Sequence, residues 1–245
     1  MAIGCAPSCW FCKNANPDVA AYSSNWIPYA LGLIIISPFT FNGNVNEIWL
    51  FVISALIGIS LGFEDWFIPK TPLNLLIGFG LLIINLDFSS SKAKFTFVIA
   101  FVLGMGVEIL GVATGEIFGV YYYGDNMGLK LLGVPYMIGL YWAVLVSATS
   151  MIVRNIFNSI FLTAVAGAMA MVILDIFMEV MAGRLDFWHF EKNIVPMQNY
   201  IVWFIVAFIL HLISYNWIPL KGVKYSLHLY FTQLTFFIVT YLILS

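Results

Sequence analysis

The sequence predicts an all-α membrane protein, a polytopic bundle of about seven or eight transmembrane helices. Three observations indicate this fold class: an apolar composition, a scarcity of charge, and long uninterrupted apolar runs. Of the 245 residues, 62% are hydrophobic and 9% are charged, and the mean hydropathy is +0.97. Soluble domains average roughly 45–50% apolar and about 25% charged residues. Because a soluble globule needs far more polar surface, this composition argues against a soluble enzyme and a disordered regulator.

We expect a polar N-terminal tail, residues 1–25, followed by a single transmembrane domain, residues 26–245. The tail lacks the basic start and apolar run of a cleavable signal peptide. Ten Lys and Arg residues against twelve Asp and Glu residues give a net charge of −2. Since this balance provides no basic field, nucleic acid is not an expected partner.

Eight apolar runs follow one another along the chain, and each is interpreted as a helical span because none shows a period of two. The third run is short for a full crossing, so a tilted or partly re-entrant segment is expected there. The predicted runs are Trp26–Phe41, Ile48–Phe63, Leu73–Leu86, Phe95–Ala113, Pro135–Val153, Ile156–Met181, Tyr200–Tyr215 and Ser226–Leu244.

The loops after the fourth and sixth runs are separated by two crossings, so we expect them on the same membrane face. With eight crossings, five Lys and Arg residues fall on each side of the membrane. This even division gives no orientation under the positive-inside rule.

Three acidic residues lie inside apolar runs, where a carboxyl group costs free energy and therefore indicates function. Glu108 lies in the fourth run, and Asp175 and Glu179 lie near the end of the sixth. The i,i+4 spacing places the last two about 6 Å apart on one helix face. At an effective dielectric constant near 20, two charges at that distance repel by roughly 2.8 kcal/mol. At least one of the pair is therefore expected to be a neutral acid that can donate a proton.

Two polar segments rich in aromatic residues follow these helices. Segment 111–135 combines closely spaced glycines with Glu116 and three consecutive tyrosines. We interpret it as a binding loop, although an interfacial aromatic belt with a turn would share the tyrosines. Segment 186–203 carries Asp186, Trp188, His189, Pro196, Asn199 and Trp203. Together with the helix carboxyls, the two segments predict one site at a membrane boundary, suited to a long apolar substrate entering from lipid.

The cysteines and histidines indicate no catalytic centre. Cys5, Cys9 and Cys12 have the C-x3-C-x2-C spacing of radical-SAM iron–sulfur loops, but the chain has no room for the soluble barrel that carries such loops. The spacing is interpreted as coincidence, or as a tail used for weak metal binding or acylation. His211 and His228 are isolated in separate runs, as packing or hydrogen-bonding histidines usually are. No metal site or cofactor is expected.

Several separated motifs lie in a fixed order within residues 95–215. They are an acid in the fourth run, Thr114-Gly115, Phe118-Gly119, Tyr121, Tyr123, Gly133-Val134-Pro135, Trp142, Asp175, Glu179, Phe187-Trp188, Val195-Pro196, Asn199 and Trp203. With these motifs the segment resembles the membrane carotenoid hydratase family of carotenoid biosynthesis proteins, which includes the bisanhydrobacterioruberin hydratases and the γ-carotene 1′-hydratases. The family usually has Pro where this chain has Val180, and Gly where it has Ile194.

The resemblance implies cofactor-free hydration of the terminal isopropylidene C=C of an acyclic carotenoid, giving a tertiary alcohol. Asp175 and Glu179 would protonate the alkene, and Glu108 or Glu116 would orient water. Aromatic faces such as Tyr123, Trp188 and Trp142 would stabilise the carbocation. The expected substrate-binding residues are Tyr121, Tyr123, Trp142, Trp188, Asn199 and Trp203.

Two other functions remain open from the sequence. A membrane lycopene cyclase would use the same protonation but exclude water. A non-catalytic transporter or carotenoid-binding membrane protein would use its acids as proton relays or structural groups. We expect the protein to lie in the cell membrane. Its expected partners are lipid, a long apolar carotenoid substrate from the bilayer, and other carotenoid enzymes.

Overall fold

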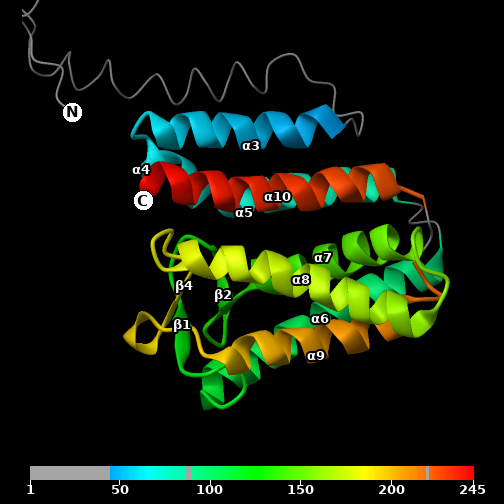
Figure 1. Ribbon diagram of the computed structural model, residues 1–245. Coiled ribbons are helices and arrows are strands. Elements are labelled where there is room, and N and C mark those ends of the chain that lie inside the picture. Colours follow the sequence, from blue (N-terminus) through cyan, green and yellow to red (C-terminus); the bar gives the residue numbers. More distant parts are fainter. Residues whose placement is uncertain (1–44, 87–89, 219–220) are drawn as a thin grey trace, which may run out of the picture. The chain divides into compact units, whose positions relative to one another are not determined.

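A computed structural model describes residues 45–86, 90–218 and 221–245 (Figure 1). The expected tail and the first apolar run, Trp26–Phe41, lie outside these residues. The elements are α3 (Val45–Ser60), α4 (Glu64–Phe67), η1 (Ile68–Lys70), α5 (Thr71–Asn85), α6 (Ser91–Thr114), β1 (Tyr121–Tyr123), β2 (Lys130–Leu131), β3 (Val134–Pro135), α7 (Tyr136–Arg154), α8 (Ile160–Ala182), β4 (Trp188–Phe190), η2 (Glu191–Asn193), α9 (Met197–Ser214) and α10 (Val223–Leu244).

The predicted all-α membrane bundle is confirmed. Six helical segments among the described residues are long and apolar enough to cross a membrane, and α3, with 16 residues, is shorter. The third predicted run differs from the expectation, because α4, η1 and α5 continue one another as a 22-residue helical segment from Glu64 to Asn85. Glu64, Asp65 and Lys70 interrupt the apolar pattern there and made the run look short. Proline lies at the first turn of η1 and again of α5, the two places where one helical element of this segment passes into the next.

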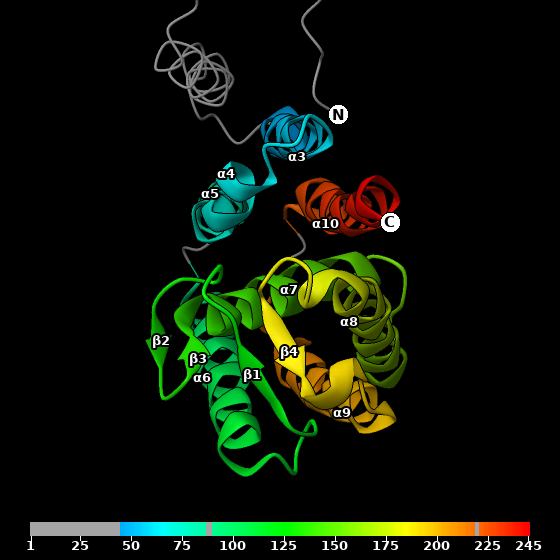
Figure 2. The same ribbon diagram turned by 90° about the vertical axis from the view of Figure 1, so that its left-hand side faces the viewer.

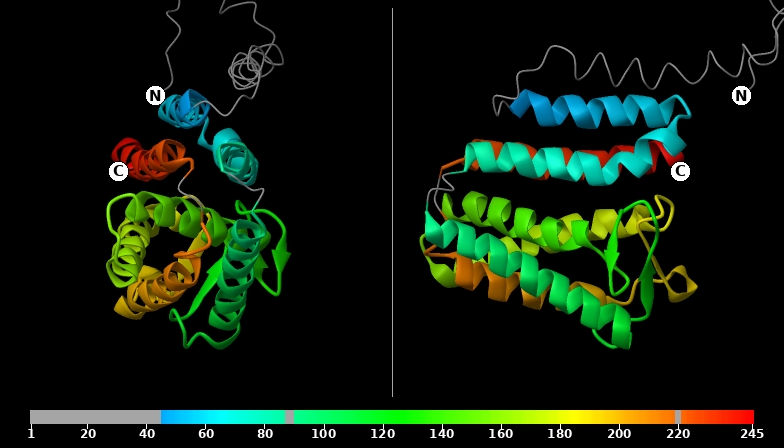
Figure 3. Two further views of the ribbon diagram at one scale, coloured as in Figure 1. Left: turned by 90° about the vertical axis from the view of Figure 1, so that its right-hand side faces the viewer. Right: turned by 180° about the vertical axis from the view of Figure 1, so that it is seen from behind.

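Helix α7 forms the centre of the bundle. In its apolar window 83% of the residues are buried, against 22–44% in the other five spans. Helices α6, α7, α8 and α9 pack in a ring, which Figure 2 shows nearly end-on, while α5 and α10 also pack on α7 and α3 packs on α10. The views in Figure 3 show that these helices run side by side along their lengths.

Gly104 allows the close approach of α6 and α7, because a Cβ atom at this position would overlap the indole of Trp142. A Cβ at Gly106, on the same helix, would meet no atom within 4 Å. We therefore expect Gly104→Ala to lower the free energy of unfolding by about 1–3 kcal/mol through overpacking. Gly106→Ala should leave it unchanged or raise it by up to about 1 kcal/mol. Thermal unfolding of both variants in detergent checks the pair, and equal effects would contradict the packing described.

The two polar segments meet at one end of the bundle as paired strands, a feature that the sequence did not predict. Strand β1 pairs antiparallel with β4, so that Tyr121 lies opposite Phe190 and Tyr123 lies opposite Trp188. These four side chains are buried, whereas Tyr122 and His189 stack on the other side of the ribbon. A second short ribbon joins β2 to β3. The pairing of β1 with β4 confirms that the loops after α6 and α8 lie at the same end.

Candidate functional site

Glu108 accepts three side-chain hydrogen bonds inside the bundle. Its Oε2 atom accepts the hydroxyls of Tyr121 at 2.6 Å and Tyr123 at 2.8 Å, and its Oε1 atom accepts the indole N–H of Trp142 at 3.1 Å. The residue is 2% exposed. Burial, and next the charge of Glu108, raise the pKa of both tyrosines, so their hydroxyls remain protonated donors. Three donors directed at one carboxyl suit an ionised carboxylate, which only accepts hydrogen bonds.

Asp175 and Glu179 are bridged by one amide. The Nδ2 atom of Asn199 donates to Asp175 Oδ2 at 3.1 Å and to Glu179 Oε1 at 3.0 Å. Glu179 Oε2 also accepts the indole N–H of Trp188, from β4, at 2.8 Å. Asp175 is fully buried, and its Oδ1 atom has no hydrogen-bond partner in the described part of the chain. The carboxyl groups of the predicted i,i+4 pair thus lie close together, held by Asn199 of α9 and by Trp188 of β4.

Glu108 and Glu179 line one cavity beneath the ribbon of β1 and β4, which we call the acid-lined cavity. About 20 Å³ of it is open to the centre of a water molecule, which is room for about one water. The lining side chains include no Lys, Arg or His. They are Glu108, Tyr121, Tyr123, Ile138, Tyr141, Met178, Glu179, Trp188, Phe190, Asn199 and Trp203. The structure therefore brings together residues from α6, α7, α8, α9 and both paired strands. Those that the sequence had singled out are Glu108, Tyr121, Tyr123, Glu179, Trp188, Asn199 and Trp203.

Three expected site residues lie outside the cavity lining: Asp175, which Asn199 bridges to Glu179, and also Trp142 and Glu116. Trp142 does not line the cavity: it lies behind the wall, donates to Glu108, and stacks on Trp203 with ring centroids 4.1 Å apart. Of these two stacked rings, Trp203 is the one that lines the cavity. Glu116 does not join the acids, because α6 ends at Thr114 and Gly115 turns the chain with a φ of +68°. Its side chain is exposed, so we omit Glu116 from the site.

Residues 72–245 match the family described as carotenoid biosynthesis protein, and this segment contains every residue of the acid-lined cavity. The chain belongs to the carotenoid biosynthesis protein family. No curated protein and no solved structure matches the chain.

In this member of the carotenoid biosynthesis family, apolar space adjoins the acid-lined cavity. A second cavity shares Ile138, Tyr141, Met178 and Trp188 with it. About 80 Å³ of this second cavity is open to the centre of a water molecule. A third, of about 60 Å³, shares Val52, Asn74, Leu75, Tyr141 and Gln233 with the second. The three spaces lie next to one another, in a series from α3, α5 and α10 to the carboxyl groups, and most of the side chains along the second and third are apolar.

Tyr141 and Gln233 are two cavity residues that were not predicted from the sequence. The Tyr141 hydroxyl donates to Gln233 Oε1 and lies 3.0 Å from Met178 Sδ. Tyr141 lines all three cavities of this series, and Gln233 lines the two more distant from the acids. A polar amide in an apolar span costs free energy, as a carboxyl does, and that signal marks Gln233 in the sequence.

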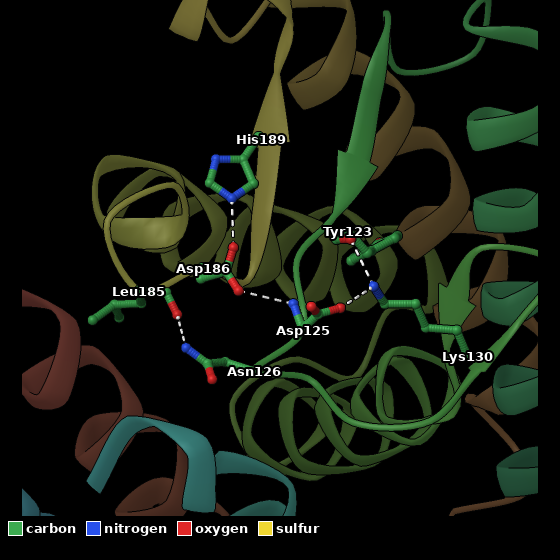
Figure 4. A network of polar contacts seen from close by, with 7 residues as sticks. All are labelled: Tyr123, Asp125, Asn126, Lys130, Leu185, Asp186 and His189. Atoms are coloured by element: carbon green, nitrogen blue, oxygen red, sulfur yellow. Dashed lines mark hydrogen bonds and ion pairs between the residues drawn. The ribbon is translucent and has the colours of Figure 1, made fainter. Parts of the chain in front are cut away.

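A polar network holds the ribbon over the cavity (Figure 4). Asp186 accepts the backbone N–H of Asp125 at 2.9 Å and pairs with His189 at 2.8 Å. Lys130 donates to the carbonyl of Tyr123 and to the Asp125 carboxylate, both at 2.9 Å. The network joins the chain after β1 to the chain before β4, and so it fixes the strands that carry Tyr123 and Trp188.

The network gives a pH-dependent prediction. The hydrogen bond with His189 is the chief cause that lowers the pKa of the Asp186 carboxyl below its ordinary value. A lowered pKa stabilises the fold above the unfolded pKa of about 3.9, and this contribution is lost as the pH falls through the folded value. We expect Asp186→Ala to speed amide hydrogen exchange in Tyr121–Tyr123 severalfold at neutral pH and to reduce its acid dependence. Glu191→Ala, at a neighbouring exposed acid, is the control; unchanged exchange in Asp186→Ala would contradict the role of the network.

Proposed function

We propose that the protein is a cofactor-free carotenoid hydratase. It adds water across the terminal isopropylidene C=C of an acyclic carotenoid and forms a tertiary alcohol. The observation that carries the proposal is that Glu108 and Glu179, with Asp175 bridged to Glu179 by Asn199, surround a cavity for one water that adjoins apolar space.

The charge balance of the cavity supports a proton donor. Glu108 and Asp175 are buried, Glu179 is half-buried beside Asp175, and no basic side chain lines the cavity that Glu108 and Glu179 share. Holding three negative charges this close together, largely away from water and without a cation, would cost far more than keeping a proton on one of the carboxyl groups. Glu108 has three donors and suits the charged form, so the proton belongs to the Asp175 and Glu179 pair.

The reaction would then proceed in two steps with the atoms balanced. Glu179, at the cavity wall with Asp175 behind it, transfers a proton to the less substituted alkene carbon and leaves a tertiary carbocation. Water adds to the cation, and its surplus proton passes to the Glu108 carboxylate. Return of that proton to the Asp175 and Glu179 pair resets the site, so the net change is the alkene plus one water.

Aromatic faces support the cation between these steps. Tyr121, Tyr123, Trp188 and Trp203 line the cavity with Glu108 and Glu179. A desolvated cation over an aromatic ring gains up to about 2 kcal/mol. The room for water favours hydration over cyclisation, since a cyclase must keep water away from the same cation.

We further propose that the substrate reaches the acids from the bilayer through the apolar spaces beside Tyr141 and Met178, within the cell membrane and in the company of other carotenoid enzymes. Co-expression with a pathway that makes an acyclic carotene tests the proposal by product mass. A hydratase adds one water to an end of the pigment. Pigment of unchanged mass but new cyclic structure would indicate a cyclase, and unaltered pigment would indicate a binding or transport protein.

A further inference from the structure

A polar cavity at the C-terminal end of α8 lies next to the acid-lined cavity. About 280 Å³ of it is open to the centres of water molecules. Arg184 and Asn193 on its rim are exposed, whereas Ala182 and Phe190 in its wall are buried. The lining residues are Glu179, Val180, Ala182, Gly183, Arg184, Trp188, His189, Phe190, Asn193 and Val195.

The polar cavity and the acid-lined cavity share one wall. Glu179, Trp188 and Phe190 line both of them. The Trp188 indole donates to Glu179 Oε2, so the two shared side chains are held against each other at 2.8 Å. The opposite oxygen of Glu179 is bound by Asn199, which lines the acid-lined cavity alone. One carboxyl group thus separates a space for several waters from a space for one.

The second cavity described above, which we call the apolar cavity, adjoins the acid-lined cavity through residues other than those that the polar cavity uses. It shares Ile138, Tyr141 and Met178 with the acid-lined cavity, and none of these three lines the polar cavity. Among the lining residues, Trp188 alone borders all three spaces. An oil-soluble molecule and water would therefore arrive at the carboxyl groups by separate routes.

We propose that the polar cavity is the route by which water and protons reach the acid cluster, which consists of Glu108, Asp175 and Glu179. Glu179 exchanges protons across the shared wall. Trp188 separates this route from the apolar route. The use of this water in hydration rests on the proposed function, whereas the access of water to the buried wall of the polar cavity does not. Protons pass between water and the Glu179 carboxyl without any other reactant.

Water access is tested by thiol reactivity at the buried wall. Ala182 is 1% exposed and lines the polar cavity, whereas the equally buried Ala168, on the same helix, lines none of the cavities described above. In a background carrying Cys5→Ser, Cys9→Ser and Cys12→Ser, we expect Ala182→Cys in proteoliposomes to react with a permanently charged thiol reagent at least tenfold faster than Ala168→Cys. Equal rates would overturn the water route, whether or not the protein hydrates carotenoids.

Blocking the cavity tests its use. A Cβ at Gly183 would meet only His189 Nδ1 at 3.7 Å and the Trp188 carbonyl at 4.0 Å, so Gly183→Ala fits as the control. We expect Gly183→Trp to fill the cavity and lower hydration at least tenfold, while carotene binding measured by its absorption spectrum stays within twofold. Hydration at the Gly183→Ala rate, or loss of hydration in proportion to binding, would overturn the route. Absence of hydration in the unaltered protein, with fast Ala182→Cys labelling, would count against the proposed function and leave the water route supported.

Discussion

Asp175→Asn is expected to lower carotenoid hydration at least about 100-fold, because Asp175 shares the proton that Glu179 delivers as the general acid. The substitution keeps the size of the side chain and its contact with Asn199, but it removes the proton held behind Glu179. Pigment binding should survive, since Asp175 lies outside the cavity lining. Product formation from an acyclic carotene in isolated membranes is the measurement.

Glu116→Gln provides the matched control for that experiment. The sequence offered Glu116 as the alternative to Glu108 for orienting water, but its side chain is exposed and lies apart from Glu108, Asp175 and Glu179. Its variant should hydrate at the rate of the unaltered protein. Full activity in Asp175→Asn, or a comparable loss in Glu116→Gln, would remove Asp175 from the mechanism.

Glu108→Leu is expected to lower the free energy of unfolding by roughly 3 kcal/mol or more. The change leaves the hydroxyls of Tyr121 and Tyr123 and the indole N–H of Trp142 without their acceptor. Each buried donor left unpaired costs about 1–3 kcal/mol. Thermal unfolding in detergent measures the loss, and Glu116→Leu, at an exposed site, should stay within about 0.5 kcal/mol of the unaltered protein.

Glu108→Gln separates the structural role of Glu108 from its chemical role. The amide keeps one accepting oxygen, so much of the stability should return. It has lost the carboxylate that takes the proton from water, so hydration should remain low. If Glu108→Gln were as unstable as Glu108→Leu, or fully active, the assignment of Glu108 as the base would fail.

The helices and the acids could be predicted because each depends on a local signal. Apolar runs mark spans, and a carboxyl group inside a span is costly enough to stand out. The spacing of Asp175 and Glu179 predicted their common face, and the structure adds the bridging Asn199 and the hydrogen bond from Trp188 to Glu179. The third span was misjudged because Lys70 and two acids break its hydropathy without breaking its helix.

The parts that the sequence did not reveal depend on tertiary pairing. Strands of three residues have almost no pattern of their own, and the register of Tyr123 against Trp188 exists only once α6 and α8 are packed. Glu116 follows Glu108 by two helical turns and would share its face in a longer helix. The left-handed Gly115 ends α6 before that turn is completed. Trp142 faces α6 rather than the cavity because Gly104 leaves space for its ring there.

The most direct measurement supplies the purified protein with an acyclic carotene in water enriched in oxygen-18. Hydration by the acid cluster predicts a tertiary alcohol heavier than the carotene by one labelled water molecule, formed by the unaltered protein and abolished in Asp175→Asn. A pigment recovered without labelled oxygen, whether unchanged or cyclised, would contradict the claim that these carboxyl groups catalyse the addition of water.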